Sequence, residues 1–418
     1  MIPLVPPPVL LDVAAACRAV GGRAFAVGGC VRDHLTGQAV KDWDVEVFGI
    51  PGDDLHAILR RFGRVDVVGR SFGVYKLAPR GGRPGEQHDI SVPRRDSKVG
   101  PGHKGIAVEG DPGMPIAEAA RRRDLTVNAM MIELSTGEIA DPWGGLADLA
   151  ARRLRAVDDD TFLEDPLRAL RVAQFAARLG FTPDPSLVAL CRRADLDELP
   201  AERVQGEWEK LLLRGHWPSL GMAFAREAGI LSRVFPAVAD DPGADRALDA
   251  LVAARASLVP DGRQWALMLA GWLARQSAAA VTDTLDRLWL HKWKGYPLRD
   301  TVTAVVARWQ DPCATDSDLR WLASRCEAGL ALAVREAVLG DTGDARARAA
   351  AMGISESAPK PLLRGRDLTA LGVPAGPRMG ELIRRVYEDQ LDGRITTPAD
   401  AAARVGELLS GTRADGGT

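Results

Sequence analysis

The first 150 residues alternate short apolar runs with polar turns, which predicts a mixture of strands and helices. The apolar spacing of residues 10–20 is that of a helix, and residues 24–27 read as a short buried strand that ends at two glycines. Apolar and polar side chains alternate along residues 43–48, which predicts a strand covered on one face. Further strands are expected at 65–68, 74–78 and 88–92.

The pattern changes after about residue 160, where Ala, Leu and Arg recur at helical spacing. Residues 97–114, rich in Gly, Pro, Lys and His, predict a mobile loop before this change. We therefore expect an α+β protein: a mixed-sheet head at 1–150, a helical neck at 151–235, and a helical body and tail at 236–410. Helices are expected at 161–180, 185–194, 201–214 and 217–229.

Composition narrows the class of protein. Apolar residues make up 46% of the 418 and charged residues 26%, which is typical of globular proteins of more than one domain. Lys and Arg number 54 against 56 Asp and Glu, so any contact with RNA must be a local patch. The five scattered cysteines predict neither zinc nor a disulfide framework. With no apolar stretch of membrane length and no secretion signal at the start, we expect a cytoplasmic protein.

The most informative stretch is Gly28-Gly-Cys-Val-Arg-Asp33, followed by Lys41-Asp-Trp-Asp44. Asp42 and Asp44 are two apart on a predicted strand, so their carboxylates stand side by side. Such a pair of like charges favours a bound cation, and carboxylate oxygens suit Mg²⁺ with substrate phosphates as further ligands. A third acid is expected nearby. Asp89 on a neighbouring strand and Glu46 on the same strand are the two candidates.

The glycines suit a phosphate. A strand that ends at Gly28 and Gly29 and runs into a short helix lets backbone N–H groups approach a polyphosphate closely. Arg32, one step later, can hold a phosphate oxygen through two hydrogen bonds. Either feature alone is more often a simple turn or a solvated strand edge. Together, and in this order, they predict a nucleotide site.

These residues resemble a known family. The Gly-Gly-x-Val-Arg-Asp and Asp-x-Asp motifs are similar to the signature of the class II tRNA nucleotidyltransferases and bacterial poly(A) polymerases, a branch of the polymerase-β-like superfamily. Three later motifs agree with the family's pattern in residue type and order. A further motif, Glu202-Arg203 followed by Glu207, extends the resemblance, which covers residues 25–213 in all. The three later motifs are Arg121-Arg-Arg-Asp-Leu-Thr-Val-Asn-Ala-Met130, Asp141-Pro-Trp-Gly-Gly-Leu-Ala-Asp148 and Glu164-Asp-Pro-Leu-Arg-Ala-Leu-Arg171.

Asp165 and Arg168 lie three apart at the start of a predicted helix, so their side chains are neighbours. Arg only donates hydrogen bonds and ionised Asp only accepts them, whereas cytosine and adenine both present an amino donor beside a ring-nitrogen acceptor. The resemblance implies that this pair reads CTP and ATP. Asp165 is also well placed to cap the helix, and the two roles are compatible.

The resemblance assigns further residues to the nucleotide. It places Arg123 and Asp124 there, with Arg171 on the triphosphate. Asp124 and Asn128 are small polar groups suited to ribose hydroxyls. Arg121 and Arg122 are interpreted as RNA-binding or surface charge.

The implied activity is template-independent addition of CMP and AMP to the 3′ end of tRNA. CTP and ATP are the substrates, pyrophosphate leaves, and Mg²⁺ ions are held by Asp42 and Asp44. An enzyme that adds only A and a bacterial poly(A) polymerase share these motifs and stay open as alternatives. So does a non-catalytic RNA-binding protein of the same fold. Neither histidine of the helical body, His216 nor His291, is followed by an aspartate, so the phosphohydrolase module that some family members carry in this part of the chain is not expected.

Overall fold

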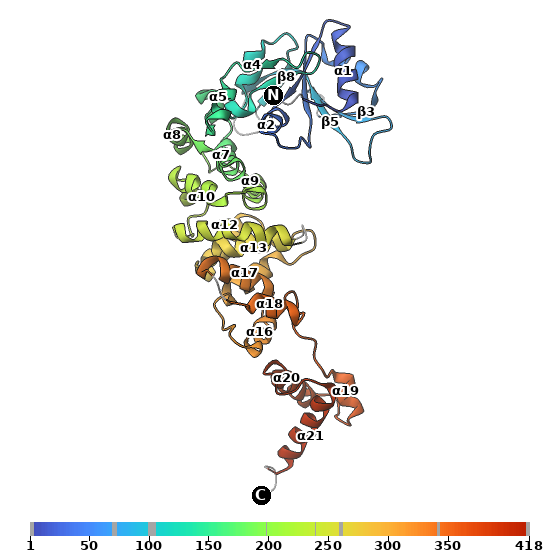
Figure 1. The fold of residues 1–418 in the computed structure, drawn as a ribbon, viewed down its shortest axis with the longest axis vertical. Helices are drawn as coiled ribbons and strands as arrows, with labels where there is room; N and C mark the ends of the chain where they lie inside the picture. Colours follow the sequence, from blue (N-terminus) through green and yellow to red (C-terminus); the bar gives the residue numbers. More distant parts are fainter. Residues whose placement is uncertain are drawn as a thin grey trace. The chain divides into compact units, whose positions relative to one another are not determined.

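The computed structural model describes residues 4–68, 73–98, 106–197, 199–238, 240–258, 262–340 and 343–414. The chain divides into two compact units. One comprises Met1–Pro200 with Phe224–Arg233, and the other Ala201–Ala223 with Val234–Thr418. The first unit holds a sheet and helices and the second is helical, which confirms the α+β prediction (Figure 1).

Within the described residues, the first unit is built on a seven-stranded sheet of order β3-β4-β5-β2-β1-β8-β9. Its central pair, β2 and β5, is parallel, and the other neighbours are antiparallel. Five of its strands, β1 to β5, lie where the sequence predicts them. The strands are β1 (Arg23–Val27), β2 (Asp44–Phe48), β3 (Gly63–Val68), β4 (Val74–Pro79), β5 (His88–Ser91), β8 (Met131–Glu133) and β9 (Ile139–Ala140).

Helices cover both faces of this sheet. On one face α1 (Pro8–Arg18), α2 (Gly29–Leu35) and α3 (Gly52–Leu59) share an apolar core with the central strands. On the other face α4 (Ile116–Arg121) packs against a second core that includes Phe25 and Phe48. The prediction that residues 43–48 are covered on one face is therefore wrong, because residues 45–48 are buried on both.

The loop predicted at 97–114 is also wrong in part. β6 (Arg94–Lys98) and β7 (Ile106–Gly110) pair as an antiparallel hairpin, and residues 99–105 lie outside the described part of the chain. The Gly, Lys and His content of 99–105 concealed the strand-forming Ile106-Ala-Val108 run that follows it.

The helix predicted at 161–180 is two helices, because the Glu164-Asp-Pro166 step interrupts it. α6 ends at Leu163 and α7 begins at Leu167, directly after the proline. Gly180 then ends α7 in the left-handed region, with φ 67°. The remaining elements of this part of the chain are α5 (Gly145–Ala150), β10 (Arg153–Leu154), α6 (Asp159–Leu163), α7 (Leu167–Leu179), β11 (Thr182–Pro183), α8 (Pro185–Arg193), α10 (Pro218–Glu227) and α11 (Ile230–Val234).

The described residues of the second unit include two groups of packed apolar side chains. Trp208, Phe235 and Trp272 pack together in the first, with ring centroids 4.8–5.7 Å apart. The second lies among α19, α20 and α21 near the C-terminal end. The helices are α9 (Ala201–Arg214), α12 (Pro242–Ser257), α13 (Gly262–Leu273), α14 (Ala278–Arg287), α15 (Leu298–Arg308), α16 (Asp316–Ala323), α17 (Ala328–Leu339), α18 (Ala345–Ala351), α19 (Gly365–Ala370), α20 (Pro377–Leu391) and α21 (Pro398–Ala414).

The helices predicted at 185–194, 201–214 and 217–229 are confirmed as α8, α9 and α10. None of the helices formed by the described residues has the length and apolar character needed to cross a bilayer.

Candidate active site

Two of the predicted acids lie side by side on the parallel pair of strands. Asp44 is the first residue of β2, and its register partner on β5 is Asp89. Asp42 lies in the bend just before β2, so the expectation that it belongs to the strand is wrong. All three acids still lie at the same end of the parallel pair β2 and β5, and Asp42 and Asp44 are both exposed there.

At this end of the strands, the negative charge of the three aspartates is only partly neutralised by nearby cations. The pKa of Asp44 is raised above its usual range by loss of hydration and by the charges of Asp89 and Asp42, although Arg123 and Lys76 oppose the shift. Asp89 has a direct cation partner, because Lys76 Nζ lies 3.2 Å from its Oδ1. Across the described residues, no three His, Cys, Asp or Glu side chains form a ready-made metal site. A cation at this end of the strands would therefore complete its coordination with water or substrate oxygens.

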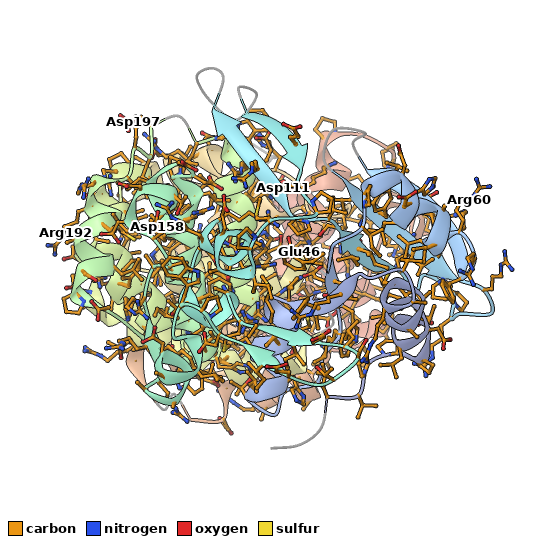
Figure 2. The ribbon with its side chains drawn as sticks, turned by 90° about the horizontal axis from the view of Figure 1, so that it is seen from above. Glu46, Arg60, Asp111, Asp158, Arg192 and Asp197 are labelled. Carbon is orange, nitrogen blue, oxygen red and sulfur yellow. The ribbon has the colours of Figure 1, made fainter. Side chains whose placement is uncertain are left out.

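Glu46, the other candidate for the third acid, is held inside the protein. Its side chain is 0% exposed, and one carboxylate oxygen lies 2.5 Å from Arg122 Nη2. The other oxygen lies 3.8 Å from Arg123 Nη2. In Figure 2, Glu46 lies within the first unit, whereas the side chain of Arg60 projects outward from its edge. The interpretation of Arg122 as surface charge is therefore wrong, because this arginine neutralises a buried carboxylate, whereas a contact of Arg122 with RNA stays a prediction.

Gly28 allows an arginine to approach the turn after β1. It has φ 75°, a conformation that favours glycine, and a Cβ there would lie 2.9 Å from Arg123 Nη1. Burial lowers the pKa of Arg123, partly offset by the charges of Glu46 and Asp44. The turn Gly28-Gly29, the Arg123 guanidinium and Asp44 therefore lie close together.

Four of the predicted nucleotide-binding residues form one hydrogen-bonded network, in which Arg171 is partly exposed and the other three are buried. Asn128 Oδ1 accepts a hydrogen bond from Arg32 Nη1 at 2.5 Å, and Asn128 Nδ2 donates to Asp124 Oδ1 at 3.0 Å. Arg171 Nε donates to Asp124 Oδ2 at 2.7 Å. Burial alone would raise the pKa of Asp124, but the charge of Arg171 and these hydrogen bonds hold it below the usual range. Arg32, Asp124 and Asn128 are at most 7% exposed, so they are well placed to orient other groups.

Arg168 is fixed at the start of α7. Its Nη1 donates to the carbonyl of Thr161 and its Nη2 to the carbonyl of Arg122, each at 2.6 Å. Burial lowers its pKa, while the charges of Asp124 and Asp165 oppose that shift. The N-cap position of α7 is Pro166 and not Asp165, but Asp165 Oδ1 accepts from the backbone N–H of Leu167 at 3.2 Å and so satisfies one free N–H group at the start of the helix.

The Asp141–Asp148 motif builds the framework beneath these residues. The carboxylate of Asp141 accepts from the backbone N–H groups of Gly145 and Leu146 at 2.7 and 2.9 Å. Asp148 is 0% exposed and accepts from Thr126 Oγ1, Arg153 Nε and Arg155 Nε at 2.7–2.9 Å.

The sequence interpretation missed two contacts among these residues. The first is the Glu46–Arg122 ion pair, and the second is made by the ring of Phe175, whose centroid lies 5.2 Å from the Cζ atoms of both Arg32 and Arg171. A glutamate inside an otherwise apolar strand was the signal for the first, since a buried carboxylate needs a cation. Phe175 had no such signal, because an aromatic residue at helical spacing usually belongs to a core.

Comparison with known proteins agrees with these motifs. Residues 24–155 match the family described as "Poly A polymerase head domain", and residues 180–241 match "Probable RNA and SrmB- binding site of polymerase A". The chain is 37% identical to the multifunctional CCA protein of Nitrosomonas europaea over 220 residues, 52% of this chain and 50% of that one. It is 40% identical to that of Aromatoleum aromaticum over 221 residues, 52% and 51%. The chain thus spans about half the length of these curated relatives.

Solved structures extend the likeness in fold to the helical part. The CCA-adding enzyme of Bacillus stearothermophilus in complex with CTP has a TM-score of 0.74 at 23% identity, covering 98% of this chain and 100% of that one. The Thermotoga maritima CCA-adding enzyme complexed with tRNA has a TM-score of 0.70 at 21% identity, covering 97% and 96%. The resemblance drawn from the motifs is confirmed: residues 24–155 match the poly(A) polymerase head-domain family, and the chain has the fold of the CCA-adding enzymes.

Proposed function

We propose that this protein adds CMP and AMP to the 3′ end of tRNA, using CTP and ATP and releasing pyrophosphate. The observation that carries the proposal is the position of Asp44 beside Asp89, next to the Gly28-Gly29 turn and Arg123. It is supported by relatives named multifunctional CCA protein and by the fold shared with CCA-adding enzymes in complex with CTP, ATP and tRNA.

Asp42 and Asp44 are the proposed ligands of Mg²⁺, with Asp89 as the third acid of the site. The donor set fits, because these are carboxylates with incompletely compensated charge and divalent ions bound by one or two carboxylates take further oxygens from phosphates. Bound Mg²⁺ would supply charge neutralisation for the attacking and leaving oxygens. Glu46 is not proposed as a metal ligand, because Arg122 and Arg123 already face its two carboxylate oxygens.

The nucleotide is proposed to lie against the Gly28-Gly29 turn, with Arg123 and Arg171 facing its phosphates. Arg32, Asp124 and Asn128 act on the nucleotide by orienting these groups, which their burial and mutual hydrogen bonds support. The chain's own contribution to the transfer is then to hold the triphosphate and the tRNA hydroxyl in line and to stabilise developing charge.

Asp165 and Arg168 are proposed to select the base. The two hydrogen bonds from Arg168 to backbone carbonyls fix the orientation of its guanidinium before any base arrives. A base with the wrong order of donor and acceptor would leave buried groups unpaired, at a cost of about 1–3 kcal/mol for each group.

The rest of the chain is proposed to carry the neck at 151–235 and an RNA-binding body and tail at 236–410. On α20, Arg384 and Arg385 each lie 2.9 Å from a glutamate one turn away, so this helix is not an unpaired basic face. The five cysteines are free, which suits the cytoplasmic location that we propose.

A second candidate is an enzyme that adds A alone, either to tRNA or as a poly(A) tail, because the matching head-domain family is named for poly(A) polymerase. Product length on one tRNA that lacks its CCA end separates the two. With CTP and ATP together we expect exactly the CCA end to be completed, and with CTP alone two residues to be added. Extension by ATP alone into long products would identify the poly(A) activity, and binding without any transfer would identify a non-catalytic RNA-binding protein.

A further inference from the structure

The ring of Phe175 carries two guanidinium groups. The side chain lies on α7 and is 5% exposed, and the Cζ atoms of Arg32 and Arg171 each lie 5.2 Å from its ring centroid. A cation within about 6 Å of an aromatic centroid is attracted by the ring quadrupole. One aromatic side chain thus contacts an arginine of α2 and an arginine of its own helix.

Salt bridges and hydrogen bonds complete a closed ring of contacts, the circuit, whose members are Arg32, Phe175, Arg171, Asp124 and Asn128. Arg32 pairs with Asp33 at 2.6 Å and Arg171 with Asp124 at 2.7 Å, so each guanidinium has its own carboxylate. Asn128 then links the two pairs through its hydrogen bonds to Arg32 and Asp124. The circuit joins α2, the 3₁₀ turn at Thr126–Asn128 and α7.

The circuit connects the turn proposed to bind the phosphates with the helix that carries Arg168, the residue proposed to read the base. α2 begins at the Gly28-Gly29 turn, and its residue Cys30 contacts the backbone carbonyl of Asp44, with its Sγ atom at 3.8 Å. Arg168, Arg171 and Phe175 follow one another at i, i+3 and i+7 along α7, so they lie on one face of that helix. Fixing the ring against Arg32 therefore fixes the face of α7 that presents Arg168.

We propose that Phe175 is a positioning residue for base selection. It holds α7 against α2 so that Arg168 meets the base of a nucleotide whose phosphates lie at the Gly28-Gly29 turn. The ring itself does not touch the nucleotide. This inference rests on the proposed function, and it assigns to an apolar side chain the alignment of the base-reading and phosphate-binding parts of the site.

The test compares Phe175→Leu, which removes the ring, with Phe175→Tyr, which keeps it. Phe181→Leu is the matched control, because Phe181 is 6% exposed just beyond α7 and, within the described residues, no guanidinium lies over its ring. Affinities for CTP and UTP are measured by equilibrium dialysis, which needs no transfer, and thermal unfolding is recorded for each variant. Should Phe175→Leu fail to fold, Phe175→Met fills more of the same space without a ring.

We expect the preference for CTP over UTP to fall about tenfold in Phe175→Leu and to persist in Phe175→Tyr and Phe181→Leu. A Phe175→Leu protein that is less stable but keeps the wild-type preference would overturn the inference, since that is the result of a purely structural role. So would a wild-type protein that binds CTP and UTP equally. A wild-type protein that prefers CTP but transfers nothing to tRNA would refute the proposed function alone.

Discussion

Glu46→Gln and Asp89→Asn distinguish the two acids that compete for the third place beside Asp42 and Asp44. Each substitution keeps the size of the side chain and removes its charge. The structure predicts opposite consequences, because Glu46 is fully buried between arginines and Asp89 is half exposed beside Lys76. Glu46→Gln should lower stability, and Asp89→Asn should lower activity.

The expected magnitudes follow from burial. Removing one partner of a buried ion pair costs about 3–5 kcal/mol. Arg122 and Arg123 are 25% and 20% exposed, so water can partly solvate them, and we expect about 3 kcal/mol for Glu46→Gln. The Asp89–Lys76 pair is 42% and 39% exposed, and pairs of this kind contribute about 0–1 kcal/mol. Loss of the Asp89 charge also relieves its repulsion of Asp44, so the net change in stability should be small.

Urea unfolding gives the stabilities, and incorporation of labelled CMP into tRNA lacking CCA gives the activities. Lowering the temperature until Glu46→Gln is folded should restore much of its transfer, whereas Asp89→Asn should stay inactive when fully folded. The reasoning is refuted if folded Asp89→Asn transfers CMP at the wild-type rate, or if Glu46→Gln is as stable as the wild type.

Three further substitutions test other parts of the site. Because the pKa of Asp44 is raised in the folded protein, folding favours the protonated form of this carboxyl group. The resulting stabilisation is fully present below the ordinary aspartate pKa and is lost as the pH rises through the raised value. Asp44→Asn should therefore be more stable than the wild type at pH 7 in EDTA and equally stable near about pH 3, as measured by urea unfolding. Asp148→Asn removes a buried carboxylate shared by two arginines and should lower the free energy of unfolding by about 3 kcal/mol. Gly28→Ala should cost about 1–3 kcal/mol in strain and raise the KM for CTP, because its Cβ would displace Arg123; unchanged KM would contradict that placement.

The strands that carry the site could be predicted from the sequence, because their apolar patterns and the residues that end or interrupt them both indicate short strands leading to polar groups. The apolar run of β1 ends at two glycines, and the acids of β2 and β5 interrupt strong strand patterns. The position of Asp89 beside Asp44 follows only from the parallel register of β2 and β5, which the order of elements along the chain does not determine.

What the sequence could not show is which charged side chains are buried. Arg122 belongs to a run of arginines and its sequence context indicates surface or RNA-binding charge. It and the adjacent Arg123 nevertheless both face the buried carboxylate of Glu46 on β2, which is far away in the sequence. Asp124 and Asn128 are polar residues of a short turn, and their burial depends on Arg32 and Arg171 arriving from α2 and α7. Such pairings depend on tertiary contacts rather than on local propensity.

The most direct test of the central claim is transfer of CMP and AMP to tRNA lacking CCA, with Mg²⁺, by Asp42→Ala and Asp44→Ala. Asp66→Ala, an exposed aspartate of β3 paired with Arg64, is the matched control. The acids at the edge of β2 are predicted to be indispensable, so both variants should fold and lose transfer while the control keeps it. Wild-type rates in either Asp42→Ala or Asp44→Ala would contradict the account.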